Sequence, residues 1–369
     1  MAQPDTAKMP LRLLMNAEPF GFGPTAAIAG FLPHLRPYYD TIGYVGKRHT
    51  LDLQRDLPYD VIHDVSSMGK EERAEVLNPI FAQYDIFLTA MDHKMAEMAK
   101  AAGMKVFYYD ALAWYWPSIP DSVRNSDLYL AQDFFGVKER LRDTFNGASA
   151  RAEIVPPIVP EAPQNVQKTH TLINLGGLQN PYWSVDAAVD YARAIIDSLR
   201  KALPADEKIV IAGSKAIEDA LSDQGVKTYD RASMQNILAA SKAAFMTPGL
   251  GNIYDVAAYD LPTIWLPPAN DSQGQQLRLL QQHAMQDAAL DWPAITGDRI
   301  DYCAEQGSVL TRIADAAVTV SHDRNAQTRL AQHAAMHFAG LTAHSKTSGL
   351  IPLFGNGGET SVADHVLRQ

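Results

Sequence analysis

Residues 245–278 read FMTPGLGNIYDVAAYDLPTIWLPPANDSQGQQLR, and this stretch decides the fold. An apolar strand ends in Pro-Gly-Leu-Gly-Asn, a helix of small residues follows, and a second apolar strand ends in Asn-Asp-Ser-Gln-Gly-Gln-Gln. This order is typical of a β-α-β unit, whose two strands lie parallel in one sheet. Because ligands bind at the carboxyl ends of such strands, the stretch predicts an α/β fold with a binding site at its turns.

The same alternation runs through the rest of the chain and predicts two domains. We expect strands at residues 11–15, 41–45, 61–64, 86–89, 105–109, 128–131 and 152–155, and again at 171–175, 208–212, 227–229, 243–246 and 263–266. We expect helices at residues 25–35, 93–102, 185–202, 234–241, 253–259 and 275–286. The proline-rich residues 156–163 interrupt the pattern and indicate a semi-rigid connector. We therefore predict two doubly wound, Rossmann-like α/β domains that face a cleft.

The composition argues against several classes of function. The chain has 369 residues, of which 47% are hydrophobic and 20% charged, so two well-packed domains are expected. A net charge of −10 and the lack of any Lys/Arg run argue against nucleic acid or a membrane surface as partner. The apolar runs are too short to span a membrane. MAQPDTAKMP resembles no secretory signal, and the lone Cys303 cannot build a disulfide framework, so we expect a cytoplasmic protein.

Glycine turns follow strands directly at residues 16–27 (NAEPFGFGPTAA), 176–183 (GGLQNPYW) and 247–255 (TPGLGNIYD). A helix that begins at such a turn offers free N–H groups to an anion, and glycine lets a phosphate approach closely. The alternative for each turn is that a tight connection needs glycine for its geometry alone. None of the turns matches a P-loop, and Ala26 stands where the dinucleotide fingerprint needs its third glycine.

The turn at residues 247–255 is the most informative of these, because several features concur. The backbone amides of residues 249–252 suit a diphosphate, and Asp255 is placed to accept hydrogen bonds from a ribose hydroxyl pair. The ordinary role of Asp255 would be a first-turn carboxylate that favours the helix dipole. Residues 270–276 then hold five amide or acid side chains, which suits a polyhydroxyl ligand, with a solvated loop as the alternative.

On these residues the chain resembles the B-fold nucleotide-sugar glycosyltransferases, and within them the N-acetylglucosaminyltransferase family that completes the lipid intermediate of peptidoglycan. The resemblance is best from residue 171 to about residue 283, and the family pattern lies along residues 234–267 without a gap. It implies that Asp255 replaces the family's ribose-binding Glu and that Gln275 and Gln276 read the sugar, after a one-residue insertion. The donor-binding residues that it implies are Gly176, Gly177, Arg231, Gly249, Leu250, Gly251, Asn252, Asp255, Asp271, Gln275 and Gln276.

The chain also departs from that family. No Lys or Arg occurs from residue 178 to residue 192, where the family carries an arginine, so backbone amides, Arg231 or Lys215 must meet the diphosphate charge. Phe22 and Pro24 stand in the region of the family's N-terminal histidine. The opening turn and the aromatic segment also resemble, more weakly, nucleoside-antibiotic glycosyltransferases such as cytosylglucuronate synthase.

The first domain therefore has to be interpreted from its own residues. Asp92, His93 and Glu18, in falling order, are our candidates for a general base, because each follows a strand end; the alternative for Asp92 is a helix N-cap. Residues 107–116 hold six aromatic side chains, which indicates either a stacking surface or core with a hydrophobic loop. The acceptor-binding residues that we expect are Phe22, Gly23, Asp110, Trp114 and Trp116.

Together these features predict a hexosyltransferase. Residues 1–155 would bind the acceptor, 156–169 would link the domains, 170–340 would bind the nucleotide sugar, and 341–369 would form a tail, with packing on the first domain as one option. The expected reaction moves a sugar, with inversion and without a metal or other cofactor, from a nucleoside diphosphate sugar, UDP-sugar favoured, to a small aromatic or nucleobase-like acceptor. We expect a monomer or homodimer. The alternatives are a UDP-sugar 2-epimerase and a non-catalytic nucleotide-binding subunit.

Overall fold

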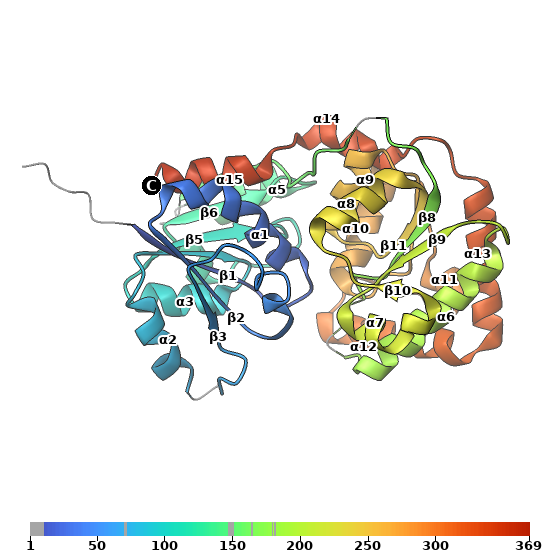
Figure 1. Ribbon diagram of the computed structural model, residues 1–369, viewed down its shortest axis with the longest axis horizontal. Helices are drawn as coiled ribbons and strands as arrows, with labels where there is room; N and C mark the ends of the chain where they lie inside the picture. The colour runs from blue at the N-terminus through green and yellow to red at the C-terminus, as the bar shows by residue number, and fades with distance from the viewer. Residues whose placement is uncertain (1–10, 70–71, 147–150, 164, 179, 181) are drawn as a thin grey trace, which may run out of the picture. The chain divides into compact units, whose positions relative to one another are not determined.

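The computed structural model describes residues 11–69, 72–146, 151–163, 165–178, 180 and 182–369, and the chain divides into two compact units (Figure 1). Unit 1 comprises Met1–Ile158 and Asn356–Gln369, and unit 2 comprises Val159–Gly355. Unit 2 therefore begins before residue 170, where we expected the second domain to start, and extends beyond residue 340. The last residues belong to unit 1.

Unit 1 is built on a parallel sheet with the strand order β3-β2-β1-β4-β5-β6-β7. Every strand that we expected here is present, within two residues of its predicted ends. β4 and β6 are buried along their whole length, as strands covered by helices on both faces must be. The strands are β1 (Arg12–Ala17), β2 (Thr41–Gly46), β3 (Val61–Asp64), β4 (Ile86–Ala90), β5 (Lys105–Asp110), β6 (Leu128–Gln132) and β7 (Arg151–Val155).

Unit 2 repeats this architecture with the strand order β10-β9-β8-β11-β12-β13, again all parallel. The order places β8 at the centre, with β9 on one side and β11 on the other, so the chain winds in both directions from β8. The strands are β8 (His170–Asn174), β9 (Ile209–Ala212), β10 (Val226–Lys227), β11 (Ser241–Met246), β12 (Thr263–Trp265) and β13 (Ala288–Ala289). The predicted pair of doubly wound α/β domains is confirmed.

Helices connect the strands in each unit and pack on the sheets (Figure 1). Those of unit 1 are α1 (Gly23–Leu35), α2 (Arg73–Phe81), α3 (His93–Ala101), α4 (Asp121–Arg124), α5 (Val137–Thr144) and α15 (Gly358–Leu367). Those of unit 2 are α6 (Val185–Ala202), α7 (Lys215–Leu221), α8 (Arg231–Ala240), α9 (Leu250–Tyr259), α10 (Asp271–Gln282), α11 (Trp292–Ile295), α12 (Gln306–His322), α13 (Arg324–Ala339) and α14 (Leu350–Phe354). Short 3₁₀ turns are η1 (Arg36–Tyr38), η2 (Arg48–Leu51), η3 (Ser222–Gln224) and η4 (Lys346–Gly349).

Four helices, α1, α8, α9 and α10, begin two to four residues earlier than the sequence predicted, and the last two bear on the site. α9 begins at Leu250 and not at residue 253, so residues 250–252 form its first turn. α10 begins at Asp271 and not at residue 275, because the Asn270 side chain accepts the Gln273 N–H at 3.0 Å and caps the helix. Both helices therefore start directly at the carboxyl edge of the sheet.

The last helix, α15, completes the core of unit 1. Val362, Ala363 and Val366 are buried in the same cluster as the inner face of α1, and Figure 1 shows α15 beside α1. The Gly358 N–H donates to the Pro157 carbonyl at 3.1 Å, which fixes the start of the helix. The end of the chain is thus a structural part of the first unit.

Candidate functional site

The carboxyl edge of the unit 2 sheet brings together two of the predicted glycine turns and the polar segment 270–276. Asn174 of β8 pairs with Met246 of β11, which pairs with Trp265 of β12, so these neighbouring strands end level with one another. The turns that follow lead into α6, α9 and α10. The edge is thus where the sequence placed the donor-binding residues.

Hydrogen bonds join these turns into one network. The Gly177 N–H donates to Thr247 Oγ1 at 2.9 Å, and the Gln273 side-chain amide donates to the Gly177 carbonyl at 2.9 Å. The Asn252 side chain donates to the Thr247 carbonyl at 2.8 Å. On the first turn, the Gly176 N–H donates to Asn174 Oδ1 at 2.9 Å. These bonds connect the turns to one another.

The start of α9 offers an open surface. Its first three residues, 250–252, have N–H groups that the helix itself cannot satisfy. A Cβ added at Gly249 or Gly251 would meet only open space, so packing does not require glycine at either position. These amides remain our candidates for contacting a diphosphate. Gly177 differs, because a Cβ there would collide with the Thr247 side chain, which is a structural reason for that glycine.

Asp255 lies in the second turn of α9, and not in the first turn where its ordinary role would place it. It is half-buried, and its burial raises the pKa of its carboxyl to about 7, while the positive charge of Arg231 opposes this shift. Arg231 is the first residue of α8 and is exposed. A carboxyl with a raised pKa at the carboxyl edge of a sheet is a candidate for a functional role.

The polar residues 270–276 do not form a solvated loop, since they cap and begin α10 and most are buried. The Gln275 amide donates to the Tyr302 carbonyl at 2.7 Å, and the Gln306 amide donates to Asp271 Oδ2 at 3.2 Å. Gln276 is only 2% exposed, and its Oε1 has no hydrogen-bond partner in the part of the chain that the structure describes. An unsatisfied buried acceptor is uncommon and marks Gln276 for mutation.

The cations that we considered for the diphosphate differ in their surroundings. Lys215 begins α7 and pairs with Glu218 at 3.3 Å and Asp219 at 2.9 Å on its own helix. Arg231 acts electrostatically on Asp255 and on Tyr259, both in α9. Arg231 is therefore the cation nearer to the predicted ribose residue.

In unit 1, Glu18 and Asp92 come together at the carboxyl edge of the sheet. Glu18 follows β1 and Asp92 follows β4, and their carboxyl groups lie close enough to shift each other's pKa. Burial and the charge of Asp92 raise the pKa of Glu18 to about 7, while Lys47 opposes this shift. Asp92 also caps α3, because its Oδ1 accepts the Met95 N–H at 3.0 Å. Asp92 therefore both caps α3 and interacts with Glu18.

The other N-terminal candidates lie around this pair. His93 is the first residue of α3 and is half-buried. Phe22 caps the start of α1 and contacts the ring of His49 edge-on, with ring centroids 5.4 Å apart. Gly23 is exposed at the first position of α1. His49 Nε2 lies 3.1 Å from the Gly21 carbonyl, so a histidine reaches this turn from a different part of the chain.

The aromatic segment is mainly core, which corrects part of our acceptor prediction. Asp110 is 2% exposed and accepts hydrogen bonds from the Tyr129 hydroxyl at 2.8 Å and the Trp116 indole at 3.3 Å, so it does not lie on an open rim. Trp114 is buried and packs on Phe134. Trp116 is half-buried. The sequence could not distinguish these roles, because buried and stacking aromatics have the same composition.

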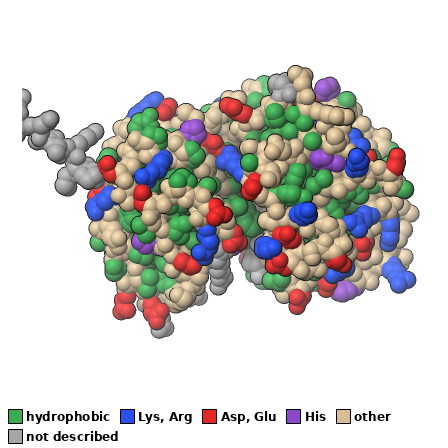
Figure 2. Space-filling view, in the orientation of Figure 1, with side chains coloured by type: hydrophobic (Ala, Val, Ile, Leu, Met, Phe, Trp, Pro, Cys, Tyr) green, Lys and Arg blue, Asp and Glu red, His purple; other side chains and the backbone are tan. Residues whose placement is uncertain are grey.

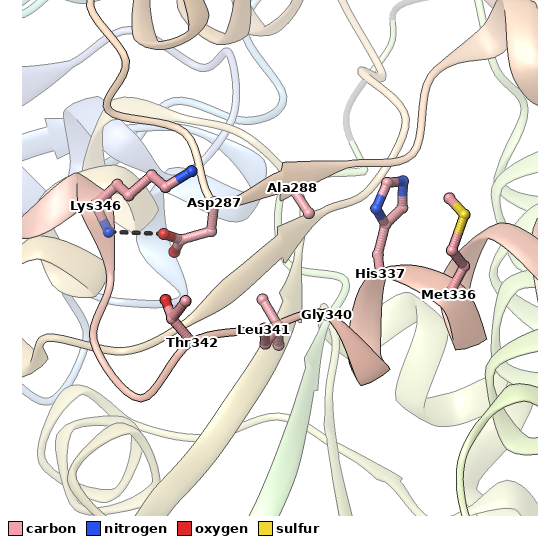
Figure 3. Close-up of a pocket in the computed structure, with 8 residues that line it drawn as sticks. All are labelled: Asp287, Ala288, Met336, His337, Gly340, Leu341, Thr342 and Lys346. Atoms are coloured by element: carbon pink, nitrogen blue, oxygen red, sulfur yellow. Dashed lines mark hydrogen bonds between the residues drawn. The ribbon is translucent and has the colours of Figure 1, made fainter.

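Other surface features lie away from these edges. A hollow of about 110 Å³ near the start of β13 is lined by Asp287, His337 and Lys346, among others, and lies at the amino edge of the unit 2 sheet (Figure 3). Acidic and basic side chains are interspersed on the face that Figure 2 shows. Among the described residues, no three His, Cys, Asp or Glu side chains cluster so as to hold a metal ion. No described helix is long and apolar enough to cross a membrane.

Comparisons with known proteins show the fold. No family model and no curated protein matches the sequence. The glycosyltransferase of kitacinnamycin matches with a TM-score of 0.52 at 11% identity, over 98% of this chain and 99% of that one. MurG of Acinetobacter baumannii matches with a TM-score of 0.50 at 12% identity, over 98% and 100%. The spinosyn rhamnosyltransferase SpnG, complexed with thymidine diphosphate, matches with 0.50 at 11%, over 93% and 100%.

The chain has the two-domain B fold of glycosyltransferases. This confirms the fold that the sequence resemblance implied. The structure also gives roles that the sequence did not assign: Thr247 and Gln273, which lie in the predicted turn and polar cluster, join the turns, Tyr302 and Gln306 hold the start of α10, and Lys47 and His49 lie at the unit 1 edge. No local pattern shows these roles, because each depends on a contact between distant parts of the sequence.

Proposed function

We propose that this chain is a glycosyltransferase that uses a nucleoside diphosphate sugar, UDP-sugar favoured, and a small aromatic or nucleobase-like acceptor. The observation that carries the proposal is the network at the carboxyl edge of unit 2. It joins the turn of Gly177, the start of α9 and the start of α10 through Thr247 and Gln273. The B fold and its glycosyltransferase neighbours support the reaction class.

Each part of the donor has a proposed set of contacts in unit 2. The amides of residues 250–252 bind the diphosphate, with Arg231 as the nearby cation, and Asp255 binds the ribose hydroxyls. Gln275, Gln276 and Asp271 read the sugar. As the bond to the leaving phosphate breaks, the α9 amides stabilise the charge that grows on it, so the proposed reaction requires no metal. The acceptor attacks the anomeric carbon directly, in a single displacement that inverts its configuration.

Calorimetry with a panel of nucleotides and nucleotide sugars, followed by turnover assays, tests this function. We expect UDP to bind and UDP-sugar to be consumed only when an acceptor is present. Consumption without acceptor would indicate an epimerase, and binding without consumption a non-catalytic subunit; either result overturns the proposal. Turnover that a chelator abolishes would contradict the metal-independent reaction.

A variant pair locates the site. Asp255→Ala should weaken UDP binding by about 10–100-fold, the effect of losing hydrogen bonds to a charged group. Asp197→Ala removes an exposed carboxylate from α6 and serves as the matched control, with affinity unchanged. If Asp255→Ala and Asp197→Ala bind UDP with equal affinity, Asp255 does not contact the donor.

A further inference from the structure

Glu18 and Asp92 occupy adjacent strand ends in unit 1. Ala17 of β1 lies opposite Ala90 of β4, and the Glu18 N–H donates to the Ala90 carbonyl at 2.9 Å. Glu18 thus stands at the first position beyond this register pair, and Asp92 at the second position beyond it on the neighbouring strand. Their carboxyl groups lie close enough to interact, and each shifts the pKa of the other. Two carboxyl groups placed in this way favour a state in which one of them keeps a proton.

The surroundings make the two members of the pair unequal. Asp92 is 7% exposed, and its Oδ1 already accepts the Met95 N–H at the start of α3. Burial raises the pKa of Asp92, whereas this bond, the charge of Lys47 and the positive end of the helix dipole favour its ionised form. Glu18 is half-buried, and its side chain accepts no backbone N–H among the described residues. The proton therefore resides on Glu18, and Asp92 is the acceptor.

A strained residue precedes Asp92. Met91 has a φ of 69°, in the left-handed region that residues other than glycine rarely adopt. The cost is on the order of 1–2 kcal/mol. Its N–H donates to the Tyr109 carbonyl at 3.0 Å, and its side chain is buried, so the surrounding structure holds this conformation. Strain of this kind gathers at functional sites, and here it sets the direction in which the chain enters Asp92.

We propose that Glu18 is the general base of the transferase and that Asp92 is its positioning residue, with one proton shared between them in the resting protein. This inference rests on the proposed glycosyltransferase function. With the shared proton gone, the Glu18 carboxylate accepts the proton of the acceptor's O–H or N–H. The acceptor's oxygen or nitrogen bonds to the anomeric carbon while the carbon–oxygen bond to the diphosphate breaks. The electron pair of the broken bond leaves with the nucleoside diphosphate.

The neighbouring charges set the pH at which the base becomes active. Burial and Asp92 raise the pKa of Glu18 to about 7, so the carboxyl loses its proton near neutrality. Lys47 favours the ionised form of both members, and its removal should raise the pKa of Glu18. The titratable groups that interact with the pair are Lys47 and Tyr44 of the β2 side, His93 and Lys94 of α3, and Tyr108 of β5.

Measuring kcat against pH at saturating donor tests the assignment. We expect kcat of the wild type to rise up to about pH 7 and then level off. Glu18→Gln should lower kcat by about 10²–10⁴-fold at every pH, the usual loss of a general base. Asp92→Asn keeps a capping side chain but removes the like charge, so its rising limb should move to lower pH. Lys47→Met should move the limb to higher pH.

Nuclear magnetic resonance of carboxyl carbons tests the shared proton without turnover. In protein labelled with ¹³C at the Glu side chain, one resonance should titrate near pH 7 and should be absent from Glu18→Gln. Asp92→Asn should move its titration to lower pH. Thermal unfolding confirms that each variant is folded, and Glu18→Asp, which keeps the carboxyl, should retain part of the turnover.

The outcomes separate this inference from the function on which it rests. If Glu18→Gln turns over at the wild-type rate, the assignment is overturned although transfer stands. The same holds if the rising limb of kcat lies at the same pH in Asp92→Asn as in the wild type. If no Glu resonance titrates near neutrality, the shared proton is excluded. If the wild type binds nucleotide sugar but transfers nothing to any acceptor, the proposed function fails and the base fails with it.

Discussion

Gly177 and Thr247 are in direct contact across the central strands of unit 2, with the Gly177 N–H donating to Thr247 Oγ1 at 2.9 Å. Gly177 follows β8 and Thr247 follows β11, so this single bond joins two glycine turns. Gln273 attaches the start of α10 to the same glycine through its carbonyl. The turns are thus preorganised, and a ligand that binds them loses little free energy in ordering them.

Thr247→Val tests this preorganisation. Valine has nearly the shape of threonine but cannot accept the Gly177 N–H, which would then lack its partner. Thr247 is fully buried, so we expect a loss of about 1–3 kcal/mol of unfolding free energy in urea, together with weaker donor binding by calorimetry. Thr247→Ser keeps the hydroxyl and is the control. If the valine variant is as stable and binds as tightly as the serine variant, the hydrogen bond is not what holds the turns.

Asp255 should make the free protein less stable as the pH rises. Its pKa is raised to about 7, so between about pH 4 and pH 7 the folded state keeps a proton that the unfolded state releases. Stability from this proton is complete below pH 4 and is lost as the pH rises through 7, by at most ~4 kcal/mol. Asp255→Asn should therefore equal the wild type near pH 4 and exceed it at pH 8.

Thermal unfolding of both proteins without nucleotide, at pH 4 and pH 8, measures the effect. Calorimetry with UDP at pH 8 should show the opposite preference, because Asn cannot replace an ionised acceptor of two hydroxyl groups. If the wild type is as stable as Asp255→Asn at pH 8, ionisation of Asp255 does not lower the unfolding free energy, and the prediction is wrong.

The sequence predicted the fold well because the signals for it are local. Short apolar runs such as residues 86–89, with glycine turns after some of them, indicate parallel strands wherever they occur, and the structure confirms the order in which they follow one another. The helix starts were predicted less well. Asn270 was grouped with a loop, although Asn before a polar first turn is also a strong N-cap.

The arrangement of the sites depends on contacts that no local pattern carries. The pairing of Glu18 with Asp92 follows from β1 lying beside β4, although 73 positions separate Asn16 from its hydrogen-bonded partner Thr89 on these strands. The burial of Asp110 depends on Tyr129 of the next strand. The aromatic composition left a stacking surface and a core segment as alternatives there, because a sequence does not show which face of a segment meets the core.

The packing of Tyr302 on Gly274 should be essential for the start of α10. A Cβ at Gly274 would collide with the Tyr302 ring, so Gly274→Ala forces the ring or the helix to move. We expect a loss of about 1–3 kcal/mol of unfolding free energy. Tyr302→Ala removes the ring, so in that background Gly274→Ala should lower the unfolding free energy very little. A double-mutant cycle measured by urea unfolding checks this, and strictly additive losses would contradict the contact.

Gln276 should contribute to sugar recognition at the expense of stability. Its side chain is 2% exposed, and Oε1 lacks a hydrogen-bond partner among the described residues. Gln276→Leu has a similar volume and removes that acceptor, so we expect unfolding free energy to stay the same or rise by about 1 kcal/mol. UDP, which has no sugar, should bind as in the wild type, whereas UDP-sugar should bind about tenfold more weakly.

Gln275→Leu provides the comparison for Gln276→Leu, since the Gln275 amide donates to the Tyr302 carbonyl at 2.7 Å. Loss of this hydrogen bond in Gln275→Leu should lower the unfolding free energy by about 1 kcal/mol, whereas Gln276→Leu should not lower it. Urea unfolding and calorimetry with UDP and UDP-sugar distinguish the two roles. Equal losses of affinity for UDP and UDP-sugar in Gln276→Leu would mean that the residue acts on the nucleotide or on the fold. A marked loss of stability in that variant would mean that Oε1 is satisfied within the protein and does not await the sugar.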